Sequence, residues 1–152
     1  MRYAAQTEVS AERSKAEIER LLQKYGATSF TSGWQGDRAA IMFELQQRRI
    51  RFVLTMPAKT DKTIVYTASR GLRRSETDRD RAWEQAVRQR WRALLLVVKA
   101  KLEAVEAGIS TFEEEFMSWI VLPDNKTVFD HVRPAIAAAY QGGTMPKLIE
   151  GW

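Results

Sequence analysis

Residues 79–107 read RDRAWEQAVRQRWRALLLVVKAKLEAVEA and contain neither glycine nor proline. Apolar side chains recur along this segment at steps of three and four residues, the spacing of one face of an α-helix. They are Trp83, Val87, Trp91, Leu94, Val98, Leu102 and Val105. At about 1.5 Å per residue the helix would reach roughly 45 Å, so we expect it to span the molecule and organise its core.

Both ends of this predicted helix carry boundary residues. Thr77 or Asp78 can act as the N-cap, and Gly108 is suited to the left-handed conformation after the last turn. Four basic residues are spaced seven, four and seven positions apart, which places them along one line of the helix. They are Arg81, Arg88, Arg92 and Lys99. Such a row is either a solvated helix face or a track for phosphates.

The chain before residue 60 predicts one helix followed by a three-stranded antiparallel sheet. Ser10 is a suitable N-cap for the helix. Apolar and polar residues then alternate in three segments, which is the period of half-buried strands. The segments are residues 30–34, 39–45 and 50–54. Around the third segment, Arg49 and Arg51 fall on the face opposite Ile50, Phe52 and Leu54. We expect that face of the sheet to be wet and partly basic.

The segment between the predicted sheet and the long helix is polar and basic. Residues 64–66 can add a short edge strand, so the sheet is expected to have three or four strands. A glycine-containing loop follows, and guanidinium groups beside a helix N-terminus would suit phosphate binding, although such loops are often only solvated connectors. The arginines of this loop are Arg70, Arg73 and Arg74.

Shorter elements are expected after the long helix. Ser110 and Glu113 fit a capping box for a short helix, and residues 119–122 predict a buried strand or extended core segment. Thr127 can cap a final helix that Pro134 would kink or restart. The whole chain, residues 1–152, is therefore predicted to be a single α+β domain with an apolar tail at residues 143–152.

Composition limits the classes of function. The chain has 152 residues, and 24 Lys and Arg against 19 Asp and Glu give a net charge of +5, which permits an acidic partner. Cysteine is absent, which excludes thiol catalysis, thiolate metal sites and disulfides. We see neither a signal peptide nor an apolar run of membrane-spanning length, and we expect a cytoplasmic protein with no membrane partner.

No motif for catalysis stands out. His131 is the only histidine, and no nucleophile motif or phosphate-binding glycine loop accompanies it. The acidic residues 113–115 fan out around a helix start, where the helix dipole alone favours carboxylates. We therefore predict no catalytic residues, no metal site and no cofactor, and a protein that is not an enzyme.

Several stretches are similar to small proteins encoded in phage and prophage genomes. They include TEVSAERSKAEIERLLQKYGATSF, GWQGDRAAIMFE and RRIRFVLTMP, and the most specific parts are RQRWR and GISTFE. The resemblance covers most of the chain and carries no known activity. It implies a viral protein that works in a bacterial cytoplasm.

Two classes of function follow from these patterns. The first is a nucleic-acid-binding protein, with single-stranded DNA in replication or recombination as the favoured ligand. Its predicted contact residues are Arg49, Arg51, Arg70, Arg73, Arg74, Arg81, Arg88, Arg92 and Trp34, and we expect the arginines to line one positive furrow. The alternative is a non-enzymatic interaction module, either a homo-oligomer or an inhibitor of a host protein.

Overall fold

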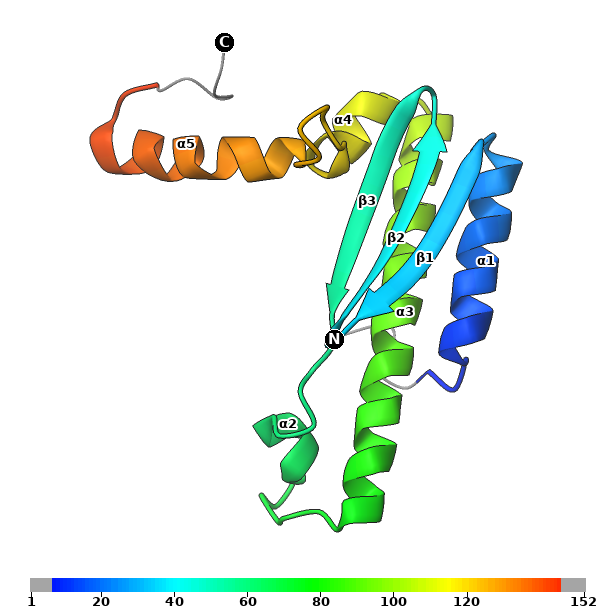
Figure 1. Cartoon of the computed structure of the whole chain (residues 1–152), viewed down its shortest axis with the longest axis vertical. Helices are drawn as coiled ribbons and strands as arrows, with labels where there is room; N and C mark the ends of the chain where they lie inside the picture. Colours follow the sequence, from blue (N-terminus) through cyan, green and yellow to red (C-terminus); the bar gives the residue numbers. More distant parts are fainter. Residues whose placement is uncertain (1–6, 146–152) are drawn as a thin grey trace.

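The computed structural model describes residues 7–145, and these residues form the predicted α+β arrangement (Figure 1). An N-terminal helix precedes a three-stranded sheet, a long helix and shorter C-terminal helices. The elements are α1 (Ala11–Lys24), β1 (Ser29–Gln35), β2 (Arg38–Leu45), β3 (Arg48–Thr55), α2 (Lys62–Val65), α3 (Glu76–Glu106), α4 (Phe112–Phe116), the 3₁₀ turn η1 (Met117–Trp119) and α5 (Val128–Gly142).

The sheet is an antiparallel meander in the order β1-β2-β3. Register follows the sequence alternation, because Phe30 pairs with Phe43 and Phe43 pairs with Ile50, all on one face. Two-residue turns join the strands, and residues 46 and 47 both adopt positive φ, which matches the twist of a tight hairpin. The expectation of two hairpins in sequence is confirmed.

One face of the sheet is covered by α1 and α3, and this interface forms the core. Phe43, Phe52 and Phe116 meet there, with ring centroids 6.2 to 6.4 Å apart. The two helices run in the same direction, since Lys15 near the start of α1 lies over Trp91 in the middle of α3, and Tyr25 at the end of α1 donates to Glu106 at the end of α3. No helix covers the opposite face of the sheet in the part of the chain that the structure describes, and that face points toward the viewer in Figure 1.

Three local predictions are wrong in detail. Residues 64–66 do not extend the sheet, because the side chain of Asp61 accepts the N–H of Thr63 and starts the short helix α2. The N-cap of α3 is Ser75, two residues before the first predicted cap. The capping box of α4 is formed by Thr111 and Glu114, one position later than expected.

The C-terminal part extends away from the helix and sheet layers (Figure 1). Ile120 forms a bridge to Ile50 at the edge of β3, so the predicted extended segment is real but only bridge-length. Thr127 caps α5 as expected, and the helix continues through Pro134 to Gly143, whose φ is +67°. Within residues 7–145 no helix is long and apolar enough to cross a membrane. Residues 146–152 of the predicted tail lie outside the described residues.

Candidate nucleic-acid interface

The solvent-facing side of the sheet carries three arginines. Arg49 pairs with Glu44 and Arg51 pairs with Met42 across β2 and β3, as the alternation predicted. Arg38 occupies the same face near the other end of the sheet, opposite Thr55. The predicted site did not include Arg38, although strict alternation from Met42 back along β2 puts it on this face.

The arginines of β3 differ in what holds them. The side chain of Arg49 makes no hydrogen bond or ion pair with any other residue in the range 7–145. Arg51 is half-buried, and its Nη2 donates to the backbone oxygen of Asn125 at 3.0 Å. Arg48 points to the helix side of the sheet, where its Nη2 lies 2.9 Å from Oε1 of Glu113. Of these three arginines, Arg49 and Arg51 have no carboxylate at ion-pair distance among the described residues. The pKa of the Asp130 carboxyl is lowered mainly by the backbone N–H of Thr127, and the nearby Arg51 lowers it further.

The basic loop lies beyond the end of the sheet, beside the start of α3. Arg74 is fixed there, because its Nη1 donates to the backbone oxygens of Thr63 and Ile64 at 2.7 and 3.0 Å. Arg70 and Arg73 are exposed, and their side chains make no hydrogen bond or ion pair with the other described residues. Arg74 is thus a structural clamp for α2, while the other two remain open to a ligand.

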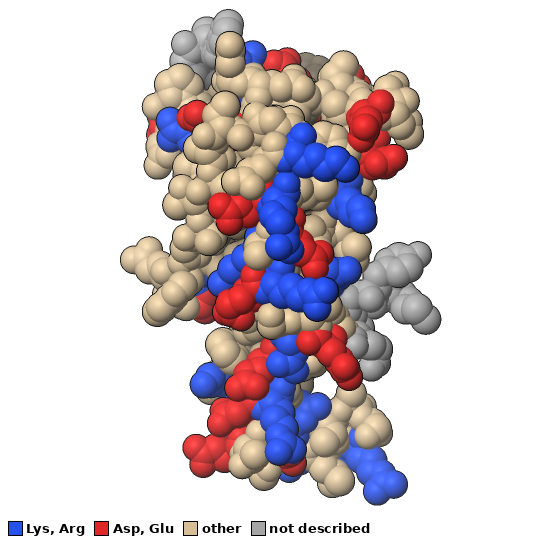
Figure 2. All heavy atoms as spheres, turned by 90° about the vertical axis from the view of Figure 1, so that its right-hand side faces the viewer, with Lys and Arg blue, Asp and Glu red and all other residues tan. Residues whose placement is uncertain are grey.

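The predicted helical row lies on α3, where it faces α1 and not the open face of the sheet. Arg92 bonds to Glu17 of α1 at 3.1 Å, and both Nε and Nη2 of Arg88 donate to the side chain of Gln85. Arg81 is exposed. Figure 2 shows Lys and Arg running down the side that α1 and α3 form, with Asp and Glu beside them. The mixture of signs weakens this row as a phosphate track.

The predicted arginines therefore form three separate groups instead of one furrow. The sheet separates Arg49 and Arg51 from the row on α3, and the loop group lies past the strand ends. Sequence spacing places residues correctly within each element, but it does not determine how the elements are oriented relative to one another. The group that shares an uncovered surface consists of Arg38, Arg49 and Arg51.

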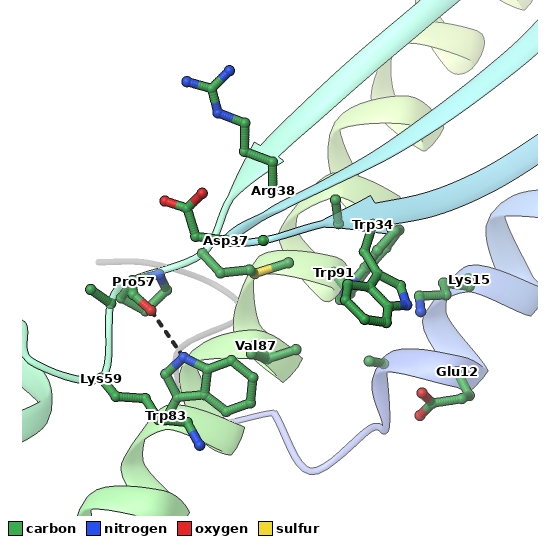
Figure 3. Close-up of a pocket in the computed structure, with 15 residues that line it drawn as sticks. Glu12, Lys15, Trp34, Asp37, Arg38, Pro57, Lys59, Trp83, Val87 and Trp91 are labelled. Carbon is green, nitrogen blue, oxygen red and sulfur yellow. Dashed lines mark hydrogen bonds between the residues drawn. The ribbon is translucent and has the colours of Figure 1, made fainter.

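Trp34 occupies an unexpected place. Its partner Ala39 is buried, so Trp34 belongs to the helix-covered face, yet its side chain is 80% exposed. It stands at a pocket of about 490 Å³ between the end of β1, the segment after β3, the start of α1 and the first half of α3 (Figure 3). Trp83 and Trp91 of α3 also line this pocket. Sequence reasoning assigned both to the core stripe and so missed the pocket.

The contact between His131 and Asp124 has a structural role. His131 Nε2 lies 2.6 Å from Oδ2 of Asp124 and ties α5 to the preceding turn. The pKa of Asp124 is lowered, chiefly because its carboxylate accepts the backbone N–H of Lys126. Among the described residues no three His, Cys, Asp or Glu side chains are grouped in a way that would hold a metal ion.

No family model, curated protein or solved structure matches the chain. Its function is therefore inferred from the placement and contacts of its own side chains.

Proposed function

We propose that the protein binds single-stranded nucleic acid across the open face of its sheet. The observation that carries the proposal is the state of Arg38 and Arg49. Both stand on the uncovered face, and neither side chain forms a hydrogen bond or ion pair with another residue within the described range. With Arg51 they provide positive groups along the strands of one sheet, which suits the backbone of a single strand.

The shape of the molecule favours a single strand over a duplex. Duplex readers insert a positively charged helix or ribbon into the major groove. The helix that projects here is α5, whose charged residues are Asp130 and Arg133 near its start, followed by neutral residues up to Gly143. It lacks the basic side chains that a major groove requires. An open sheet beside an exposed tryptophan fits an unpaired strand better.

Salt dependence tests the proposal directly. Three phosphate contacts on a single strand predict a slope of about −2 in log K against log salt, or about 20-fold weaker binding at 200 mM than at 50 mM. Fluorescence anisotropy with labelled single-stranded and duplex oligonucleotides measures this. The double variant Arg38→Glu, Arg49→Glu should abolish binding, whereas Arg48→Glu, from the helix-facing side of β3, should retain most of it. Binding that ignores salt, or survives the double reversal, would contradict the proposal.

A second candidate is a protein-interaction module, and the observation that favours it is the apolar surface of α5. Phe129 and Ile136 are exposed and Tyr140 is 90% exposed on a helix whose packing within the described chain is mainly against η1. Exposed large apolar side chains grouped on one element are typical of protein contacts. Light scattering of the wild type and of Ile136→Ser, Tyr140→Ser tests for a second copy, since only a contact through α5 makes the variant's mass lower.

A further inference from the structure

The tryptophan pocket has a rigid wall, a rigid floor and an open side. Trp83 Nε1 donates to the backbone oxygen of Pro57 at 2.9 Å, which fixes the plane of that ring. Trp91 is only 2% exposed and closes the base of the pocket. Trp34 stands across the pocket from Trp83 with most of its ring free (Figure 3). A volume of about 490 Å³ lies within the range of roughly 300–1,000 Å³ that is usual for small-ligand pockets.

Two ammonium groups stand over the pocket's aromatic rings. Lys15 Nζ lies 4.7 Å from the ring centroid of Trp91, and Lys59 Nζ lies 5.0 Å from that of Trp83. Neither lysine forms an ion pair within residues 7–145, so both charges are available to an anion. Glu12 and Asp37 also line the pocket, but Asp37 points away from the tryptophans (Figure 3).

We propose that this pocket receives the base and phosphate of one nucleotide. A flat ring can stack on the free face of Trp34, and base stacking on an aromatic side chain is tolerant of sequence. The phosphate beside the ring can approach the two ammonium groups. A cationic ligand is disfavoured, because Lys15 and Lys59 already occupy the positions over the rings that it would need.

The pocket is continuous with the open face of the sheet. Arg38 lines the pocket and is also the first arginine of that face, and the turn of Gly36 and Asp37 separates it from Trp34. For a strand, the inference rests on the proposed function: one unstacked base enters the pocket while the backbone continues past Arg38 toward Arg51 and Arg49. A duplex cannot supply such a base without breaking a pair. A free nucleotide has the same base and phosphate, and it is the other ligand that could supply them to the pocket.

The experiment compares three probes on four proteins. The probes are an oligo(dT) about twelve nucleotides long, an abasic strand of equal length and free dAMP at millimolar concentration. The proteins are the wild type, Trp34→Ala, Trp34→Phe, and Tyr140→Ala, which removes an equally exposed aromatic ring from α5. All three substitutions fall on exposed side chains, and circular dichroism checks that each variant is folded.

The expected result is specific to the base. Loss of one stacked base should weaken oligo(dT) binding by about 5- to 150-fold in Trp34→Ala. Trp34→Phe should recover most of this loss, and Tyr140→Ala should bind as the wild type does. Binding of the abasic strand should be equal in all four proteins.

The binding results distinguish an error in the pocket inference from an error in the proposed function. If Trp34→Ala binds oligo(dT) normally while Arg38→Glu, Arg49→Glu does not, the pocket inference is overturned and the proposed function stands. If no strand binds but dAMP binds and depends on Trp34, the pocket is a free-nucleotide site and the proposed function fails. If none of the three probes binds the wild type, both are overturned.

Discussion

Three arginines of β3 occupy different environments, and replacing each with glutamine should give graded effects on binding. Arg49 is free, Arg51 bonds to Asn125, and Arg48 pairs with Glu113 on the helix side of the sheet. Each phosphate contact on a single strand contributes about 0.7 to the slope of log K against log salt. The wild type, with Arg38, Arg49 and Arg51 in contact, should have a slope of about −2.

Arg49→Gln should lower the magnitude of this slope to about 1.4, so that affinity falls only about 7-fold between 50 and 200 mM salt. Its free energy of unfolding should change little, because the side chain makes no hydrogen bond or ion pair with the residues that the structure describes. Arg51→Gln should lower the slope equally and also loosen the turn at Asn125. Arg48→Gln should leave the slope unchanged.

Anisotropy titrations at four salt concentrations measure the slopes, and urea unfolding of the same proteins measures stability. Equal slopes for Arg48→Gln and Arg49→Gln would refute the assignment of the open face as the binding surface, since only one of these side chains lies on it. An unchanged slope in Arg49→Gln together with a lower one in Arg48→Gln would move the contact to the helix side.

Other predictions concern stability. Phe116→Ala, which empties a fully buried site against three other rings, should cost about 3–5 kcal/mol in urea unfolding, and a loss below about 1.5 kcal/mol would contradict the packing described. The pKa of Tyr25 is raised to about 12, chiefly because its hydroxyl donates to Glu106, so its stabilising effect is present below about pH 10 and is lost as pH rises through 12. Tyr25→Phe should remove the last tyrosinate step in an absorbance titration and flatten the alkaline loss of stability; an unchanged titration would contradict the contact. Thr127→Ala should cost about 1 kcal/mol by uncapping α5. The pKa of Asp130 is lowered mainly by the N–H of Thr127, so the stabilising effect of the cap should be present above about pH 4 and be lost as pH falls through the lowered pKa. Protection factors of the α5 amides, corrected for the intrinsic pH dependence of exchange, that stay constant down to acid unfolding would argue against it.

Most of the fold follows from the spacing of apolar residues and from the capping and turn residues in the sequence. The three-four spacing from Trp83 to Val105 and the strict alternation through the strands identify the core faces, since each face must bury its apolar side chains. The misplaced elements are short. A four-residue helix such as α2 has too few positions to show a period, and its start depends on one Asp61 side-chain contact. Caps one or two residues apart satisfy the same sequence rule, as Thr77 and Ser75 do.

The site was less predictable because it depends on the arrangement of elements in space. Alternation correctly put Arg49 and Arg51 on the exposed face, and the same rule would have added Arg38. Nothing in local sequence indicated that Arg48, their neighbour, would be neutralised by Glu113, which is 65 positions away. The pocket of Trp34 likewise combines residues from β1, α1, α3 and the segment after β3. Pairings at such separations are determined by tertiary packing.

Backbone amide shifts recorded while an unlabelled oligo(dT) is added to ¹⁵N-labelled protein test the central claim most directly. The open-face account predicts that the largest changes fall on residues 34–38 and 49–51 and weaken with added salt. Changes centred on α5 or on the exposed side of α1 and α3, or no changes at all, would contradict it.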